Sequence, residues 1–349
     1  MPFKKPEKLH KGDTVAIVSP SWGGPHSFPH IYENGLRVLR EWGLKIKEFP
    51  TARMDASFLR ANPRVRAKDI NEAFADSNVK AIFASIGGND SVRILPFLDK
   101  KIIAKNPKIL MGYSDTTTLH VFCNMQNIVT FYGPSIMAGF SQMNALSPKF
   151  KSHAHEMLFD PKEKYEYKAY GTYCDGYPDW SKKENTGKVN PMKKDNGWHW
   201  LQGKGKTCGE LFGGCVEVLD MMKATDFWPK KKFWKNKIFF LETSEDKPSL
   251  HYIDETLRNY GMQGVFDRIG GLIFSRARSF SDHEKMELEK TLVRVVANEF
   301  GRENLPIIAN FDTGHTDPQF VLPLGILAEI DCKNKKVGLI EPWMTKNGK

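Results

Sequence analysis

The chain has 349 residues, of which 40% are hydrophobic and 12% aromatic, and this composition excludes a disordered protein. The length is typical of two domains. The apolar runs are far shorter than the roughly 20 residues that a membrane-spanning helix needs. The formal charge of +10 is compatible with a nucleic-acid partner, with an anionic small substrate, or simply with a solvated surface.

The first twelve residues and the cysteine content indicate in which cellular compartment the protein functions. Residues 1–12 are basic but contain no apolar segment like that of a signal peptide. The five cysteines are widely spaced and odd in number, which favours free thiols in a reducing environment. We therefore expect a cytoplasmic protein.

Strand-like apolar runs alternate with helical patterns in the first 150 residues. Strands are predicted at 14–18, 44–49, 81–85 and 109–111, and helices at 31–42, 65–74, 91–98 and 116–127. Strands separated by single helices indicate βαβ units. The pattern therefore predicts an α/β fold whose first sheet is mostly parallel, with helices on both faces.

A different composition begins near residue 160. Residues 160–205 are rich in Tyr, Lys, Gly, Asp, Pro and Trp and show no period of 2 or 3.6. A second series of elements follows, with strands at 208–212, 237–241, 269–274, 307–310, 327–331 and 337–340 and helices at 214–222, 249–260 and 283–300. We predict an N-terminal domain at 1–165, a linker and substrate loop at 166–205, and a C-terminal domain at 206–349.

The sharpest local motif is Gly112-Tyr113-Ser114-Asp115-Thr116, which lies between a predicted strand and a predicted helix. A serine at such a turn stands above the sheet, and the following N–H groups are free to bind an oxyanion. The closing glycine of the usual nucleophile elbow is replaced by Thr116. The same residues also suit the N-cap of an ordinary helix.

Other polar or glycine-rich positions follow predicted strands. Gly87-Gly88 would let a backbone approach a ligand, Glu242 ends an apolar strand, and His315 lies in a loop rich in Gly and Asp. A histidine in such a loop can act as a general base whose ring a carboxylate orients. Each position also has a purely structural interpretation. Gly87-Gly88 would form a tight turn, Glu242 would begin an acidic turn, and His315 would be an ordinary turn histidine.

Three further features have less specific interpretations. His153-x-His155 is an isolated pair, so no metal site is predicted. The run Lys230-Lys231-Lys232 is typical of a solvated surface. Trp180, Trp198 and Trp200, in the irregular stretch, would either pin that loop to a core or present a stacking face to a flat ligand.

Taken together, these segments resemble the LD-carboxypeptidase family of serine peptidases, in the branch of the microcin C self-immunity protein. The similarity extends over nearly the whole chain, and the order and spacing of the segments are more specific than any one of them. The segments are Lys11-Gly12-Asp13-Thr14-Val15-Ala16-Ile17-Val18-Ser19-Pro20-Ser21, Gly87-Gly88, Gly112-Tyr113-Ser114-Asp115, Gly209-Glu210-Leu211-Phe212-Gly213-Gly214, Leu241-Glu242 and Gly314-His315-Thr316-Asp317-Pro318.

The resemblance implies a flavodoxin-like N-terminal domain and a smaller β-rich C-terminal domain, with a Ser-His-Glu triad assembled between them. It implies Ser114 as nucleophile, His315 as general base and then acid, and Glu242 as the residue that orients the imidazole. The backbone N–H groups of Gly88 and Asp115 would form the oxyanion hole. It further implies a homodimer that needs no metal or other cofactor.

Two substrates are compatible with the resemblance. One branch cleaves the amide that joins an aminoacyl or peptidyl group to a nucleotide, and Trp180, Trp198 and Lys247 match its substrate contacts. The other branch removes the terminal D-alanine from a murein tetrapeptide. The tryptophans favour the nucleotide-linked substrate, with neither a nucleic-acid nor a membrane partner. A non-catalytic protein that binds nucleotide or RNA is a less favoured alternative.

Overall fold

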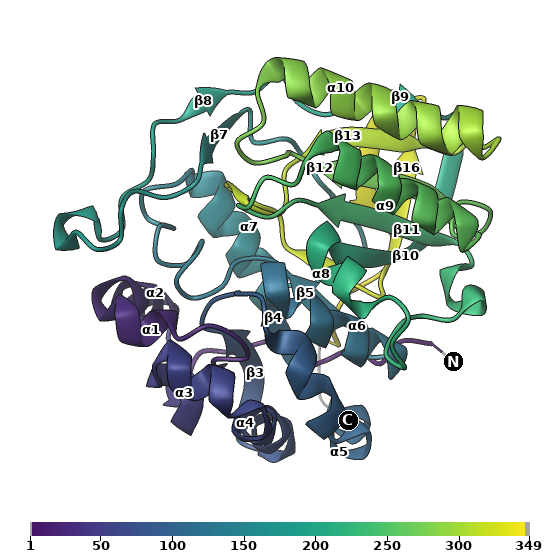
Figure 1. The fold of residues 1–349 in the computed structure, drawn as a ribbon. Helices are drawn as coiled ribbons and strands as arrows, with labels where there is room; N and C mark the ends of the chain where they lie inside the picture. The colour runs from purple at the N-terminus through teal and green to yellow at the C-terminus, as the bar shows by residue number, and fades with distance from the viewer. Residues whose placement is uncertain (1, 346–349) are drawn as a thin grey trace.

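The computed structural model describes residues 2–345, which form two large sheets and one small sheet (Figure 1). The N-terminal part of the chain surrounds a mostly parallel six-stranded sheet, and a separate eight-stranded sheet lies beside it. This arrangement confirms the predicted fold class. No helix within residues 2–345 is both long enough and apolar enough to cross a membrane.

The first sheet has the strand order β15-β5-β4-β3-β1-β2. Its strands are β1 (Thr14–Val18), β2 (Lys45–Glu48), β3 (Val79–Ala84), β4 (Ile109–Gly112), β5 (Thr130–Tyr132) and β15 (Leu322–Leu324). Strands β1 to β5 pair in parallel, whereas β15 pairs antiparallel with β5. A segment from near the C-terminus therefore completes the N-terminal sheet.

Helices connect these parallel strands, and one further helix follows β5. The α-helices are α1 (Gly24–Ser27), α2 (Pro29–Glu41), α3 (Ala56–Ala61), α4 (Pro63–Ala75), α5 (Lys100–Lys105), α6 (Thr117–Met125) and α7 (Pro148–Phe159). Short 3-10 turns occur at η1 (Pro50–Arg53), η2 (Ser91–Phe97) and η3 (Ser114–Thr116). The helix expected at 91–98 is η2, and Pro96 within it lacks the N–H that an α-helix would use.

The second sheet has the strand order β6-β17-β16-β10-β11-β12-β13-β9. Its central strands β10 (Lys206–Cys215), β11 (Lys237–Glu242), β12 (Gly271–Ser275) and β13 (Ile307–Phe311) are parallel. Antiparallel strands border them: β6 (Tyr165–Glu166), β9 (His199–Gln202), β16 (Leu327–Asp331) and β17 (Lys336–Leu339). The helical elements of this half are α8 (Val216–Met222), η5 (Lys231–Trp234), α9 (Leu250–Met262), α10 (Asp282–Val293) and the π-helical η6 (Arg294–Glu299).

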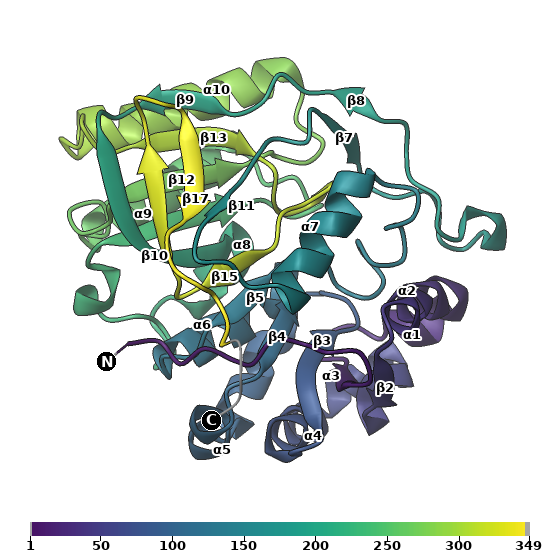
Figure 2. The same ribbon diagram turned by 180° about the vertical axis from the view of Figure 1, so that it is seen from behind.

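The stretch at 160–205 crosses the molecule rather than forming a layer of its own (Figure 2). Its strands β6 and β9 occupy the two edges of the second sheet. β7 (Thr172–Asp175), β8 (Lys193–Lys194) and β14 (Thr316–Asp317) make the small sheet, and η4 (Lys183–Asn185) is a single turn. The domain limits at 165 and 205 stay a prediction.

The core has two clusters, and the strands contribute alternate residues to them. In β11, Ile238 and Phe240 belong to one cluster, whereas Phe239 and Leu241 belong to the other. This alternation follows from the two-residue period of a strand, and burial on both faces explains the continuous apolar run. Both clusters contain residues of both large sheets, so the two halves pack directly against each other.

Candidate active site

Three polar side chains meet where the carboxyl ends of the two large sheets face each other. Ser114 follows β4, Glu242 is the last residue of β11, and His315 lies in the turn after β13. His315 Nε2 lies 3.0 Å from Ser114 Oγ, and its Nδ1 lies 2.6 Å from Glu242 Oε2. One half of the molecule thus supplies the hydroxyl, and the other half supplies the imidazole and the carboxylate.

The turn at Ser114 has a strained backbone. Ser114 adopts φ +59°, in the left-handed region that non-glycine residues seldom occupy. Its N–H donates a 3.1 Å hydrogen bond to the hydroxyl of Tyr132. A Cβ at Gly87 would lie 3.0 Å from Ser114 Oγ, so only glycine leaves the hydroxyl free at this position. The segment after β3 therefore packs closely against the Ser114 side chain and needs a glycine at position 87.

Glu242 is fully buried, and both of its carboxylate oxygens have partners. Oε2 accepts from His315, and Oε1 accepts a 2.5 Å hydrogen bond from the Tyr132 hydroxyl. Gly314, at φ +87°, brings the chain close, since a Cβ there would lie 2.6 Å from Glu242 Oε2. The carboxylate is fixed in position and holds the Nδ1 side of the imidazole.

A second carboxylate contacts the other side of the imidazole. Glu245 Oε2 lies 2.9 Å from His315 Nε2, the atom that also faces Ser114. Burial lowers the pKa of His315, but Glu242 and Glu245 outweigh burial and raise that pKa to about 10. The hydrogen bond from His315, together with its charge, lowers the pKa of Glu245 to about 2. Both carboxylates therefore favour the protonated form of the imidazole in this arrangement.

Two backbone N–H groups lie beside the serine. Asp115 is at the start of η3, where N–H groups have no partner within the helix, and the N–H of Gly88 donates no hydrogen bond within residues 2–345. The Asp115 carboxylate accepts from the N–H groups of Asp90 and Ser91 at 2.9 and 2.8 Å. This bridge fixes the Gly87-Gly88 turn against the serine turn.

A cavity of about 500 Å³ opens over the serine. Its lining is largely aromatic, with one arginine and one carboxylate among the polar groups: Trp22, Phe28, Tyr113, Tyr177, Trp180, Arg278 and Glu245. Trp180 packs on Phe28 and Tyr177, with ring centroids 5.9 and 5.2 Å apart. The irregular stretch therefore supplies one wall of the cavity.

Two residues expected to contact the substrate lie outside this cavity. Trp198 packs on Phe311, and its Nε1 donates a 2.8 Å hydrogen bond to Asp312, three residues before His315. Lys247 forms a 2.8 Å ion pair with Glu284. In this structure Trp198 supports the turn that carries His315, and Lys247 is bound to the start of α10.

Three residues of the site were absent from our predictions. Tyr132 links Ser114 to Glu242, but it ends a three-residue strand that no period indicates. Glu245 lies three residues after Glu242, so the acidic turn was a signal for it. Arg278 follows β12 in Ser275-Arg276-Ala277-Arg278, and the end of a parallel strand was again the available signal.

The described part of the chain contains no group of three or more His, Cys, Asp or Glu side chains suited to a metal ion. The polar groups at the site instead suit acyl transfer. A hydroxyl, an imidazole and a buried carboxylate are connected in series, with free N–H groups beside the hydroxyl. This combination allows attack of the hydroxyl on a carbonyl carbon.

Comparisons with known proteins agree with this chemistry. Residues 15–133 match the LD-carboxypeptidase N-terminal domain, and residues 208–330 match the LD-carboxypeptidase C-terminal domain. The chain is 25% identical to the microcin C7 self-immunity protein MccF of Escherichia coli, over 97% of this chain and 96% of that protein. It is 28% identical to the probable murein peptide carboxypeptidase of Bacillus subtilis, over 95% and 92%. A structure of MccF in complex with aspartyl sulfamoyl adenosine superimposes with a TM-score of 0.85, at 26% identity, over 98% and 100% of the two chains.

Proposed function

The chain belongs to the LD-carboxypeptidase family and is a serine peptidase-type hydrolase, and from this premise we propose that Ser114, His315 and Glu242 are its catalytic triad. The observation that carries the proposal is the continuous series of contacts from Ser114 Oγ through the imidazole to Glu242, at 3.0 and 2.6 Å. The bond cleaved is an amide.

The geometry suggests two successive acyl transfers. Ser114 Oγ attacks the carbonyl carbon while His315 Nε2 takes its proton, and Glu242 stabilises the resulting imidazolium. The N–H groups of Gly88 and Asp115 bind the oxyanion. His315 then protonates the leaving amine, the C–N bond breaks, and an acyl-enzyme forms. Water, deprotonated by His315, hydrolyses that ester and restores Ser114.

Glu245 must leave His315 for this reaction to begin. It contacts the same Nε2 that has to accept the serine proton, and a protonated imidazole cannot act as a base. The Glu245 side chain is 54% exposed, so it can turn into solvent. The resting contact therefore stabilises the protonated imidazole, and the pKa of His315 falls when Glu245 moves away.

We propose that the acyl group is aminoacyl or peptidyl and that the leaving group is linked to a nucleotide. The aromatic side chains over Ser114 offer stacking faces for a base, and Arg278 offers a cation for a phosphate. The similarity to a protein solved with aspartyl sulfamoyl adenosine supports the same substrate class. Detoxification of such a conjugate is the corresponding biological role.

A murein tetrapeptide with a terminal D-alanine is the second candidate. Arg278 suits the terminal carboxylate of a peptide as well as it suits a phosphate. The similarity to the murein peptide carboxypeptidase of Bacillus subtilis supports this alternative. The aromatic lining favours the nucleotide-linked substrate, since a murein tetrapeptide has no flat base to stack.

One assay tests both the triad and the substrate. Wild type and Ser114→Ala would each be offered aminoacyl sulfamoyl adenosine and a murein tetrapeptide, with products separated by mass. We expect wild type to cleave the nucleoside conjugate and Ser114→Ala to lose about 10⁴-fold or more in kcat/KM with an unchanged melting temperature. A Ser135→Ala variant, a buried serine outside this cavity, is the control.

Cleavage of the tetrapeptide alone would reject the nucleotide-linked substrate. Cleavage by Ser114→Ala at the wild-type rate would reject the triad. A homodimer and a cytoplasmic location stay predictions from the family resemblance, and light scattering coupled to size-exclusion chromatography tests the first of them.

A further inference from the structure

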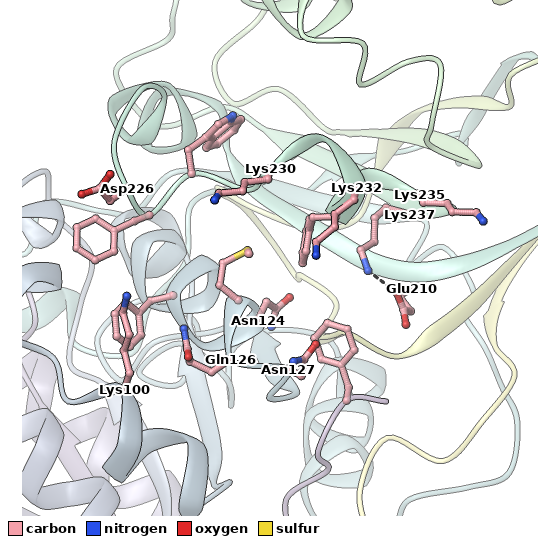
Figure 3. A pocket seen from close by; sticks show the side chains of 16 residues that line it. Lys100, Asn124, Gln126, Asn127, Glu210, Asp226, Lys230, Lys232, Lys235 and Lys237 are labelled. Carbon is pink, nitrogen blue, oxygen red and sulfur yellow. Dashed lines mark hydrogen bonds and ion pairs between the residues drawn. The ribbon is translucent and has the colours of Figure 1, made fainter. Parts of the chain in front are cut away.

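A second cavity, of about 640 Å³, lies between the two halves at the ends of the strands opposite to Ser114 (Figure 3). One side comes from the start of α5 and the end of α6, with Lys100, Asn124 and Gln126. The other side comes mainly from residues 226–237, which lead into β11 and include its first residue. The volume is in the range of small-molecule sites rather than that of a flat macromolecular surface.

The charge in this cavity is unbalanced. Five lysines line it, against two carboxylates: Lys100, Lys230, Lys232, Lys235 and Lys237, with Glu210 and Asp226. Lys237 is buried and forms an ion pair with Glu210. Within residues 2–345, Lys230, Lys232 and Lys235 form no ion pair, although all three are exposed at the cavity.

Unpaired cations gathered around one cavity attract an anion. Like charges at close range repel each other, and a bound multivalent anion removes this repulsion. Figure 3 shows Lys230 and Lys232 on one side of the cavity and Lys100 on the other, so an anion between them would meet ammonium groups from both halves of the molecule.

A buried amide oxygen in the same lining, that of Asn124, favours a ligand that carries a hydrogen-bond donor. Asn124 is 1% exposed, and its Nδ2 donates to Ile128 O at 2.9 Å and to Thr130 Oγ1 at 3.3 Å. Its Oδ1 has no hydrogen-bond partner within the described residues. A buried acceptor without a donor is costly, so a ligand with a hydroxyl or amino donor, directly or through one water, would stabilise it.

Aromatic side chains complete the lining. Phe227 lies under the ammonium group of Lys100, 5.8 Å from ring centroid to Nζ, and Phe233 and Trp228 border the same space. Their half-buried rings offer apolar faces to a flat group. We propose that this cavity is a second, non-catalytic site for a phosphorylated small molecule of the nucleotide class, bound by Lys100, Lys230 and Lys232, with Lys235 at its edge.

The proposed site is separate from the cavity over Ser114, since the two linings share no residue. Strand β11 begins at Lys237 beside the second cavity and ends at Glu242, a length of about 17 Å. The inference therefore does not depend on the proposed peptidase activity, and the Ser114→Ala variant should bind the phosphorylated ligand at this cavity as wild type does.

ADP is a suitable probe, with tripolyphosphate as an anion that has neither a base nor hydroxyl donors on a sugar. Lysine acylation with and without ADP, read by peptide mass spectrometry, separates this site from any binding over Ser114. We expect ADP to slow acylation of Lys230, Lys232 and Lys235 by about fivefold or more, and tripolyphosphate to bind about tenfold more weakly than ADP.

A matched pair of triple variants tests the assignment by calorimetry. We expect K230Q/K232Q/K235Q to weaken ADP binding at this site by about tenfold or more, and added salt to have the same effect. The control K204Q/K333Q/K335Q removes the same charge from exposed lysines elsewhere and should stay within about twofold of wild type.

Four results would overturn the proposal: no protection of the three lysines by ADP, equal loss of binding in both triple variants, tripolyphosphate binding as tightly as ADP, or protection by an RNA oligonucleotide alone. The last result would assign the surface to a macromolecule.

Discussion

The charged side chains at the two ends of β11 are arranged in opposite ways. At its carboxyl end, Glu242 and Glu245 both contact His315, and Glu242 and His315 are almost completely buried. At its amino end, Lys230, Lys232 and Lys235 are exposed and have no ion-pair partner within residues 2–345. Buried, paired charges fix the direction of a proton transfer, whereas exposed, unpaired charges attract ions at a distance.

The largest effect on activity should come from a substitution of Glu242, which lies among the paired charges at the carboxyl end of β11. Because Tyr132 donates to Oε1, the amide of Glu242→Gln would keep its oxygen toward Tyr132 and turn its NH₂ group toward His315 Nδ1. The imidazole would then carry its proton on Nε2 and could not accept one from Ser114. We expect kcat/KM to fall by about 10³- to 10⁴-fold with the melting temperature within a few degrees. A loss below tenfold would contradict the assigned role of Glu242.

A smaller effect should follow from removing an aromatic side chain that lines the cavity over Ser114. Trp180→Ala should raise KM for a nucleoside-linked substrate about tenfold, because a stacking face is lost, with kcat nearly unchanged. KM for a murein tetrapeptide should change little. Trp200→Phe, in β9 outside the cavity, is the matched control. Equal effects on both substrates would mean that Trp180 only supports the fold.

Glu245→Gln should change the pH profile. Two carboxylates, Glu242 and Glu245, contact the imidazole directly. Other groups also face His315: the charges of Asp317 and Arg278 and the ring of Tyr113. Without the charge of Glu245, the pKa of His315 falls and the neutral base forms at lower pH. We expect the acidic limb of kcat/KM to move down by about one pH unit.

The control for this experiment is Asp246→Asn, which removes the neighbouring exposed carboxylate. Its profile should match that of wild type. An acidic limb that stays in place, or that moves to higher pH, in Glu245→Gln would show that Glu245 does not hold the imidazole in its protonated form.

The smallest expected effect is on ligand binding among the unpaired lysines at the amino end of β11. Asp226 is an exposed carboxylate among the lysines of the second cavity, and Asp226→Asn makes that cavity more cationic. ADP binding there should strengthen by about twofold, and the difference should vanish at high salt. Calorimetry at two salt concentrations measures this change, and weaker binding in Asp226→Asn would argue against an anion site.

Much of the fold follows from the sequence, because long buried strands leave a clear apolar pattern. The runs that form β1, β3, β4 and β11 were predicted within a few residues, since each is buried on both faces. The three-residue strand β15 was not predicted. A strand this short is defined by its distant pairing partner, which no local period shows.

The same distinction applies to the candidate site. Ser114, Glu242 and His315 follow or end strands, and a strand end is a local feature of the sequence. Tyr132 became visible only through its contacts with residues far along the chain. For Trp198 the sequence allowed either pinning or stacking, and the hydrogen bond to Asp312 shows that it pins the loop in this structure.

The pairing of β15 with β5 also has a consequence for biosynthesis. Strand β5 is finished early in translation, but its neighbour comes from Leu322–Leu324, so one edge of the first sheet stays open until about 190 further residues have been made. A nascent chain carries Ser114 long before His315, the proposed general base, has been synthesised. Closure of the sheet edge and assembly of the proposed triad therefore both wait for the segment 315–324, and the chain is most exposed to aggregation during this interval.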